Sequence, residues 1–128
     1  MRDLTESQID RQNILNNAIA INELQSKMHL NGIRWENNTW FTKEYVAKLY
    51  DVDIRTIENQ VSKNYEEITG NGYKVLNTTE LAELKQFAPE IHFGSKLRTL
   101  GLFSFKAVLN MAMLLRNSKK AVVYEWRR

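Results

Sequence analysis

Apolar residues recur at helical spacing near the N-terminus of this 128-residue chain. Between residues 5 and 30 they fall mostly three or four positions apart, with polar residues between them, which is the pattern of one amphipathic helix. Asp3, Thr5 or Ser7 can cap this helix, and Gly32 is expected to end it. The apolar stripe consists of Ile9, Ile14, Leu15, Ala18, Ile21, Leu24 and Met28. We expect the helix to pack against the rest of the chain or against a partner chain.

Residues 33–41, IRWENNTWF, predict a β-hairpin. Apolar and aromatic residues flank Glu36-Asn37-Asn38, and asparagine tolerates the positive φ that tight hairpin turns require. Trp35 and Trp40 are expected to face the helices. Aromatic rings near a nucleic-acid-binding segment can stack on bases, but packing in the core is the favoured interpretation.

The segment Thr42–Lys63, TKEYVAKLYDVDIRTIENQVSK, predicts two short helices joined by a tight turn, which is the pattern of a helix-turn-helix. Ala47 supplies a small residue where the helices cross, and Ile57, ten positions later, supplies a core residue of the second helix. The other apolar residues between the helices are Val46, Val52 and Val61. A plain helical hairpin in a small core is the alternative interpretation.

Polar residues mark the ends of both expected helices. Thr42 can cap the first helix, and the carboxylate of Asp53 can cap the second by accepting a hydrogen bond from the amide of Thr56. Asp51 lies in the turn, where glycine is common because a positive φ is needed, and aspartate adopts that conformation more readily than most residues.

Further strands and helices are predicted after this pair. Gly70-Asn71-Gly72 indicates a turn, and Tyr73–Leu76 a short strand where a wing would lie, so that Lys74 could reach a phosphate. The elements expected next are a helix from Thr78 or Thr79 to about Phe87, an irregular connector over residues 88–98, a strand over Thr99–Phe103, an apolar core helix over Phe105–Leu115 and a last helix from Ser118.

These patterns together predict an α+β fold that is mainly helical. We expect about six helices with short β-hairpins, built around a helix-turn-helix that could be winged. The chain then divides into an N-terminal amphipathic helix, residues 1–32, and a module of residues 33–128 that forms the N-terminal part of a longer protein.

The net charge of +3 conceals an uneven distribution. Residues 1–93 carry 10 Lys and Arg against 14 Asp and Glu, whereas residues 94–128 carry 8 against Glu125 alone. Such a basic segment can contact the phosphates that dominate nucleic-acid affinity. Pairing with acidic residues of the same or a neighbouring chain is an equal alternative. The basic residues are Lys96, Arg98, Lys106, Arg116, Lys119, Lys120, Arg127 and Arg128.

The residue types point away from catalysis. Cysteine is absent, which excludes disulfides and thiolate metal sites, and His29 and His92 lack the neighbouring carboxylates of a metal site. No nucleophile elbow or glycine-rich phosphate loop occurs. We therefore expect no enzyme activity, metal, cofactor or small-molecule substrate. No apolar run approaches the roughly 20 residues of a membrane span, and the N-terminus does not resemble a signal peptide, so a cytoplasmic location is expected.

Three stretches resemble a known family: WFTKEYVAKLYDVDIRTIENQV, EEITGNGYKVLNTTELAELKQF and LGLFSFKAVLNMAMLLRNSKKA. They are similar to the N-terminal DNA-binding region of RhuM-type virulence-associated proteins, and to the wider KilA-N and Bro-N group of phage and bacterial modules. Trp40, Phe41 and Thr42 match the opening of the group's helix pair, and Leu102–Ala121 matches its later strand and helices. The resemblance covers residues 35–128, and the N-terminal helix lies outside it.

The resemblance implies DNA binding by a winged or helix-turn-helix-like module. The second helix would present Arg55, Thr56, Asn59, Ser62 and Lys63 to the groove of DNA. Arginine can pair with guanine and asparagine with adenine, each through two hydrogen bonds. The residues expected to contact phosphates are Lys74, Lys119 and Lys120, with Arg127 and Arg128 as further candidates. A solvated basic helix is the alternative interpretation of the C-terminal residues.

The helix pair itself has balanced charge. Residues 42–63 carry four basic and four acidic side chains, and Glu58 is expected on the exposed face of the second helix. There it would repel phosphate or accept a hydrogen bond from a cytosine amine. Most of the affinity for phosphates would therefore come from elsewhere, chiefly from the basic residues after Gly94.

The expected function is sequence-specific binding of double-stranded DNA by a homodimer, as a regulatory or targeting module of a phage-related or bacterial protein. The N-terminal helix is the candidate dimer contact. One alternative is an antirepressor-like protein-interaction module without DNA binding, which the acidic balance of residues 1–93 favours. The other is a targeting domain for a C-terminal effector that follows Arg128.

Overall fold

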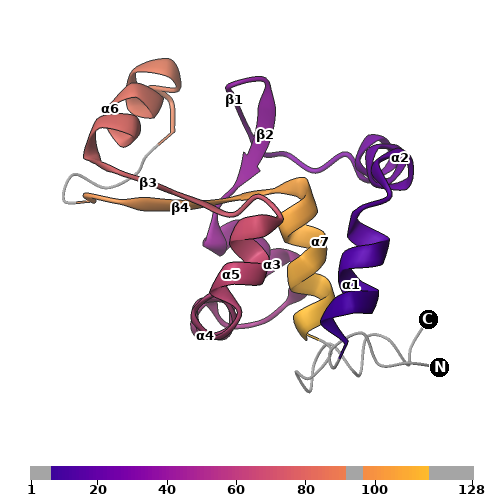
Figure 1. Cartoon of the computed structure of the whole chain (residues 1–128). Helices are drawn as coiled ribbons and strands as arrows, with labels where there is room; N and C mark the ends of the chain where they lie inside the picture. Colours follow the sequence, from indigo (N-terminus) through magenta and orange to yellow (C-terminus); the bar gives the residue numbers. More distant parts are fainter. Residues whose placement is uncertain (1–6, 92–96, 116–128) are drawn as a thin grey trace.

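A computed structural model describes residues 7–91 and 97–115 of the chain. Within them the fold is α+β and mainly helical, as predicted, with seven helices and one four-stranded antiparallel sheet (Figure 1). The elements are α1 (Gln8–Leu15), α2 (Ala18–Met28), β1 (Ile33–Trp35), β2 (Asn38–Phe41), α3 (Lys43–Tyr50), α4 (Ile54–Lys63), α5 (Tyr65–Gly70), β3 (Lys74–Leu76), α6 (Thr78–Phe87), β4 (Leu100–Ser104) and α7 (Phe105–Leu114).

The sheet has the strand order β1-β2-β4-β3. β4 pairs with both β2 and β3, so that Trp40 lies opposite Ser104 and Leu76 lies opposite Leu100. Figure 1 shows β3 and β4 extending together away from the helices, with α6 beside the end of this arm. The last strand in sequence therefore lies inside the sheet and joins the hairpin to the arm.

The N-terminal region contains two helices, so the prediction of one helix over residues 5–30 was wrong. The chain breaks at Asn16 and Asn17, where the Asn17 side chain accepts a hydrogen bond from the amide of Ala20 (3.1 Å) and begins α2. Asparagine favours such caps because its side chain competes for backbone groups. Ser7 caps α1, one of the three predicted caps, and α2 ends before His29, which has a left-handed φ of 51°, rather than at Gly32.

The predicted hairpin is confirmed. Glu36 and Asn37 in its turn have φ values of 51° and 61°, which suit the tight turn between two twisted strands. Trp35 and Trp40 are buried, and the indole N–H of Trp40 donates to the carbonyl of Trp35 (3.0 Å). They pack with leucines of β3, β4 and α6, which confirms the predicted core role.

The later elements match their predictions with three differences. α5 was not predicted as a helix, and it includes Gly70, which had been placed in the turn. α6 begins after Asn77, whose side chain accepts from the amide of Glu80 (2.8 Å) while the Glu80 carboxylate accepts from the amide of Asn77. This reciprocal pair makes Asn77 the cap, in place of Thr78 or Thr79. The last predicted helix, from Ser118, lies outside the described residues.

One core joins the helix pair α3–α4 to the sheet and to α7. Phe41 of β2, Val46 of α3, Ile57 of α4 and Phe103 of β4 are almost fully buried in it, together with most of the inner face of α7, including Met111. Because these residues come from distant parts of the chain, they fix the position of α3 and α4 relative to the sheet.

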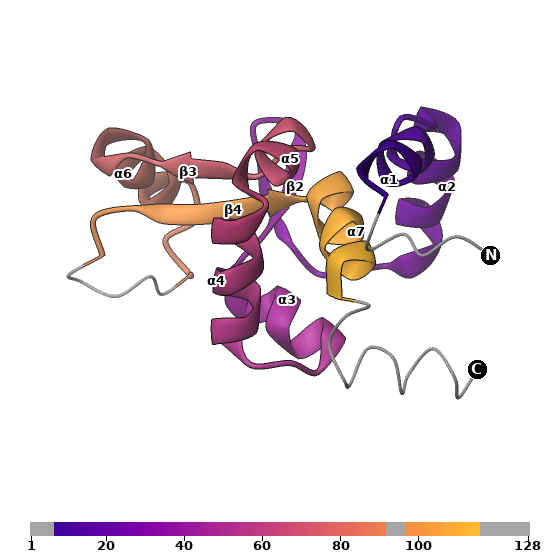
Figure 2. The ribbon, with the colours of Figure 1, turned by 60° about the horizontal axis from the view of Figure 1, so that its bottom comes forward.

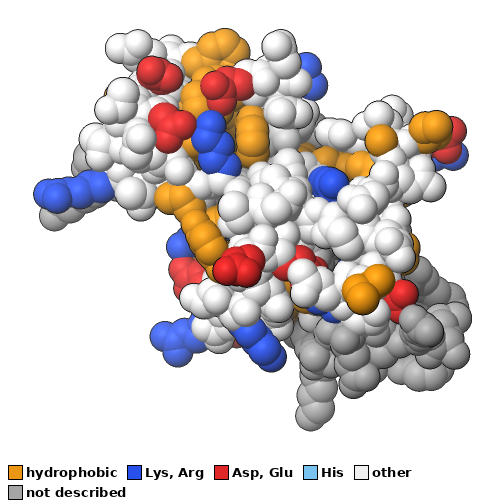
Figure 3. Space-filling model, in the orientation of Figure 1, with side chains coloured by type: hydrophobic (Ala, Val, Ile, Leu, Met, Phe, Trp, Pro, Cys, Tyr) orange, Lys and Arg blue, Asp and Glu red, His pale blue; other side chains and the backbone are white. Residues whose placement is uncertain are grey.

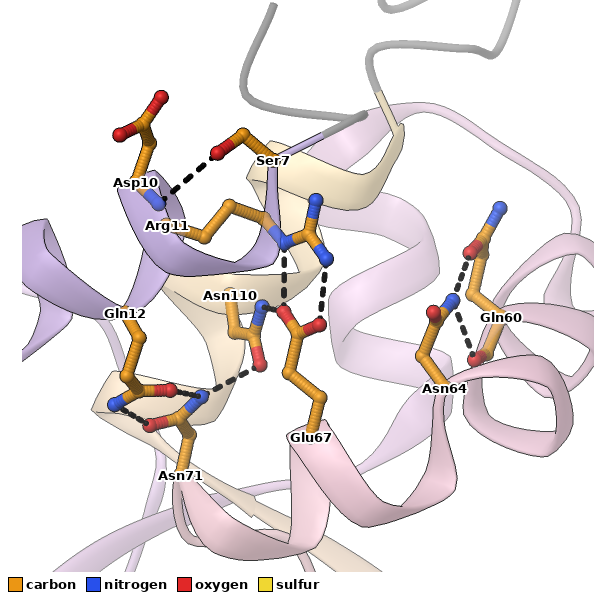
Figure 4. A network of polar contacts seen from close by, with 9 residues as sticks. All are labelled: Ser7, Asp10, Arg11, Gln12, Gln60, Asn64, Glu67, Asn71 and Asn110. Carbon is orange, nitrogen blue, oxygen red and sulfur yellow. Dashed lines mark hydrogen bonds and ion pairs between the residues drawn. The ribbon is translucent and has the colours of Figure 1, made fainter.

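A buried polar network attaches α1 and α5 to α7 (Figure 4). The guanidinium of Arg11 donates two hydrogen bonds to the carboxylate of Glu67, at 2.7 and 2.6 Å. Asn110 donates to the same carboxylate (2.7 Å) and accepts from Asn71 (2.9 Å), which exchanges two further hydrogen bonds with Gln12. No buried side-chain nitrogen or oxygen in the described part of the chain lacks a partner, so the burial of this charge pair is compensated.

Glu67 is held in its charged form. Burial by itself would raise the pKa of this carboxyl, but the hydrogen bonds from Arg11 and Asn110 and the positive charge of Arg11 outweigh burial and lower the pKa below its ordinary value. A carboxyl with a lowered pKa stabilises the fold above its ordinary pKa, and this contribution is lost as the pH falls through the lowered value.

Replacing Glu67 tests the network. Glu67→Gln should lower the free energy of unfolding by about 3 kcal/mol, because it removes the buried negative charge that accepts hydrogen bonds from Arg11 and Asn110. Urea denaturation at neutral pH measures this change, and Glu66→Gln, an exposed neighbour on the same helix, is the matched control.

The difference between wild type and Glu67→Gln should also depend on pH. It should be complete above 4.5, the ordinary glutamate pKa, and shrink as the pH falls below it. A difference that does not change down to the pH of acid unfolding would contradict the assignment of a stabilising charged Glu67.

Gly72 is required in the turn before β3. Its φ is 108°, and a Cβ at this position would overlap the side chain of Ser104. The hydroxyl of Ser104 donates to the carbonyl of Asn71 (2.9 Å) and accepts from the amide of Ala107 (3.1 Å), which caps α7. Ser104 therefore cannot move aside without losing both hydrogen bonds.

Two glycine substitutions should differ sharply. Gly72→Ala should lower the free energy of unfolding by about 2 kcal/mol, since a residue forced into such a conformation costs roughly 1–3 kcal/mol. Gly70→Ala is the control, because nothing lies within 4 Å of its added Cβ. Thermal and urea unfolding of both variants provide the comparison, and equal stability would rule out the role given to Gly72.

Candidate nucleic-acid interface

The turn between α3 and α4 places the two helices close together. Thr42 caps α3, as predicted, because its hydroxyl accepts from the amide of Tyr45 (3.2 Å). Asp51 has the expected left-handed conformation, with φ 53°, and the amide of Val52 donates to the carbonyl of Ala47 (3.0 Å). This hydrogen bond closes the end of α3, as C-terminal motifs with a left-handed residue do.

Asp53 precedes α4, but its carboxylate does not cap the helix. The amide of Thr56 donates to the backbone carbonyl of Asp53 (3.0 Å), and Asp53 makes no side-chain cap hydrogen bond. The prediction of a carboxylate cap was therefore wrong, because the carbonyl already satisfies the amide that the carboxylate was expected to bind.

The core between α3 and α4 is the one that the spacing predicted. Val46 and Ile57 are fully buried and Ala47 is 3% exposed, and all three belong to one buried cluster. Val52 and Val61 pack at the border of the same core. The pair is thus a fixed unit with one face of α4 turned inward.

The opposite face of α4 is open to solvent. Arg55, Asn59, Ser62 and Lys63 are all exposed, and their spacing of three and four positions places them on one side of the helix. Thr56 is half-buried, nearer the border of the core. Figure 2 shows α3 and α4 projecting together from the rest of the described chain. Four of the five residues predicted on this helix therefore form one accessible surface, which we term the α4 face.

An ion pair lies next to the α4 face. Nζ of Lys43 on α3 is 2.6 Å from Oε2 of Glu58, and the hydrogen bond to Glu58 raises the pKa of Lys43 above its ordinary value. Both side chains are about half exposed, so the pair adds little to stability. The pair affects the local charge instead, because Lys43 offsets the negative charge of Glu58. The net charge of the α4 face is then positive, owing to Arg55 and Lys63.

The structure places Lys74 away from the α4 face, in a cluster on β3. Its Nζ lies 3.2 Å from Glu80, 3.6 Å from Glu36 and 5.6 Å from the ring centre of Trp35. Partial burial lowers the pKa of Lys74, but the hydrogen bond with Glu80 and the charges of both carboxylates raise it overall. A phosphate contact by Lys74 would compete with these ion pairs, and it stays a prediction.

The predicted phosphate contacts Lys119 and Lys120 lie outside the described residues, as do Arg127 and Arg128. Arg98, just before β4, is exposed, and Lys106 on α7 is half-buried.

No protein-family model matches this sequence, and comparisons with curated proteins and with solved structures give no match either.

Residues 7–91 and 97–115 contain no group of three or more His, Cys, Asp or Glu side chains that could hold a metal ion. None of their helices has the length and apolar character needed to span a membrane.

Proposed function

We propose that this chain binds double-stranded DNA in a sequence-specific manner, with α3 and α4 acting as a helix-turn-helix and α4 entering the major groove. The observation that carries the proposal is the α4 face, where four polar or basic side chains lie together on a helix fixed from behind by a shared core. A projecting helix of this kind fits the major groove, which admits an α-helix. The chain would serve as a regulatory or targeting module.

The chemistry of the α4 face suits base reading. Arg55 can bind the two acceptors of guanine, and Asn59 can bind adenine through one donor and one acceptor. Four residues along a helix rise about 6 Å, and successive bases on a strand are about 3.4 Å apart. Arg55 and Asn59 can therefore reach bases about two steps apart, while Ser62 and Lys63 can contact the backbone.

The order of the strands supports a winged form of this module. β3 follows the helix pair after α5, and it pairs with β4 in an antiparallel arm, which is the kind of element that a wing would be made of. The resemblance of residues 35–128 to RhuM-type, KilA-N and Bro-N modules points to the same function. Phosphate contacts beyond the α4 face would come from Lys119, Lys120 and their basic neighbours.

DNA binding should depend on Arg55. Arg55→Ala should weaken binding to a selected duplex about tenfold or more, since a bidentate base contact contributes about 1–3 kcal/mol of discrimination. Fluorescence anisotropy with duplexes selected by the purified chain measures the change. Lys27→Ala, which removes one exposed charge from α2, is the matched control.

Salt dependence separates this proposal from its rival. Binding to random duplex should weaken steeply as salt rises, because phosphate contacts release counterions. Absence of binding to any duplex at low salt would refute DNA binding and favour a protein-interaction module. A similar loss for Arg55→Ala and Lys27→Ala would show that α4 does not read the bases.

A second copy of the chain is the proposed partner on the DNA. Two-fold operators are read by two-fold proteins, and α1 and α2 expose an apolar surface that the described chain does not cover. Ile19 is 77% exposed and Ile9 is 75% exposed, and α2 contains no buried residue. The other large apolar residues exposed on these helices are Ile14, Leu24 and Met28.

The oligomeric state tests this contact. Wild type should sediment as a dimer at micromolar concentration, and Ile19→Asp should sediment as a monomer because it places a charge in the apolar contact. Phe87→Asp is the control, since Phe87 is 63% exposed on α6, away from these helices. A monomeric wild type would remove the dimer proposal without affecting the DNA-binding test.

A further inference from the structure

Two hollows lie between side chains of α2 and of the β1–β2 hairpin. Figures 1 and 2 show these two elements apart from the α3–α4 pair. One hollow of about 530 Å³ and a second of about 390 Å³, which reaches the first turn of α7, share the lining residues Asn22, Gln25, Asn38 and Thr39. These two neighbouring hollows together are termed the α2–hairpin groove. The volume of each lies within the range of about 300–1,000 Å³ typical of small-molecule sites.

Among the described residues, the groove is lined by basic but not by acidic side chains. Residues 1–93 carry an excess of acidic residues, yet no Asp or Glu of the described chain lines either hollow. The basic lining residues are Arg34 and Lys106, and His29 adds an imidazole. In Figure 3 a basic side chain and no acidic one lies in the hollow between the hairpin and α2.

Arg34 is positioned at the groove by the hairpin. Its Nη1 donates to the hydroxyl of Thr39 on the paired strand (3.1 Å), which leaves other guanidinium N–H groups able to bind an anion. Neither Arg34 nor Lys106 forms an ion pair in the described part of the chain. Both charges are therefore available to a ligand.

Carboxamides supply most of the remaining polar lining. Asn22, Gln25, Asn37 and Asn38 each offer two N–H donors and one carbonyl acceptor. Such a set can hydrogen-bond to a ligand that alternates donors and acceptors, such as a nucleobase or the hydroxyls of a sugar. Among the apolar lining residues, Phe41 and Phe105 are almost fully buried, whereas Ile21 and Leu30 are half-buried and Ala18 is exposed. The second hollow can therefore also contact an apolar part of a ligand.

We propose that the α2–hairpin groove binds a small phosphate ester. Arg34, which lines the larger hollow, supplies the positive charge for the phosphate, because a guanidinium can donate two parallel hydrogen bonds. Lys106 lines the neighbouring hollow and adds a second positive charge there. The carboxamides of Asn22, Gln25 and Asn38 bind the organic part. Nucleotides and sugar phosphates share this chemistry, and the site is independent of DNA binding by α4.

Titration of the full chain followed by two-dimensional NMR tests the site. The probes are adenosine monophosphate, glucose 6-phosphate and inorganic phosphate. One of the two esters should cause saturable shifts of the side-chain amide signals of Asn22, Gln25 and Asn38, and the ester that binds more tightly identifies the source. Equal affinity for inorganic phosphate would overturn the role of the carboxamides, and no saturable shift with any probe would overturn the proposal.

Matched variants locate the binding. Arg34→Gln should weaken binding of the ester about tenfold, the loss expected for a hydrogen bond to a charged group. Lys106→Gln, which removes a charge from the neighbouring hollow, should weaken it less. Lys27→Gln, whose side chain does not line the groove, should bind as wild type does. Arg55→Ala should also retain binding, which keeps this test separate from the test of the α4 face. Equal weakening in all four variants would show general attraction to positive charge and overturn the site.

Discussion

The buried pair of Arg11 and Glu67 is the interaction on which the arrangement of the helices depends. It joins α1 to α5, and through Asn110 it joins both to α7. Because α5 follows α4 after a single residue, Asn64, the network also holds the segment that follows the end of α4. An apolar core alone tolerates small sliding of helices, whereas hydrogen bonds to a buried carboxylate specify one arrangement. The outward face of α4 then lies opposite Ile57, which packs in the core with residues of α3 and α7.

Much of the fold could be predicted because its signals are local. The turn at Glu36 and Asn37, the left-handed Asp51 and the spacing of Ala47 and Ile57 each lie within a few residues of what they determine. Local signals gave wrong predictions where more than one nearby residue could cap a helix or end it. Asn17 divides a periodic apolar stripe into two helices, and Asn77 takes the cap expected of the following threonines, because asparagine side chains bind nearby backbone amides.

The missed features of the candidate site come from contacts distant in sequence. Lys43 and Glu58 are 15 residues apart and meet only because α3 and α4 pack in one register. Arg11 and Glu67 are 56 residues apart, and no sequence period relates them. The sequence alone therefore predicted that Glu58 would repel phosphate, because it does not show that Lys43 lies beside Glu58 and offsets its charge. The groove between α2 and the hairpin could not be predicted from the sequence either. Its lining residues come from separate segments that share no motif.

The place of β4 in the sheet has a consequence for the order in which the chain can fold. β2 ends at Phe41, but the strand that completes its pairing begins only at Leu100. During synthesis the hairpin, α3 and α4 therefore emerge long before their common sheet partner and the apolar face of α7. Contacts of such large sequence separation slow folding and prolong the exposure of apolar surface. In the nascent chain, Trp40 and Phe41 therefore lack their partners on β4 until about residue 104 has left the ribosome.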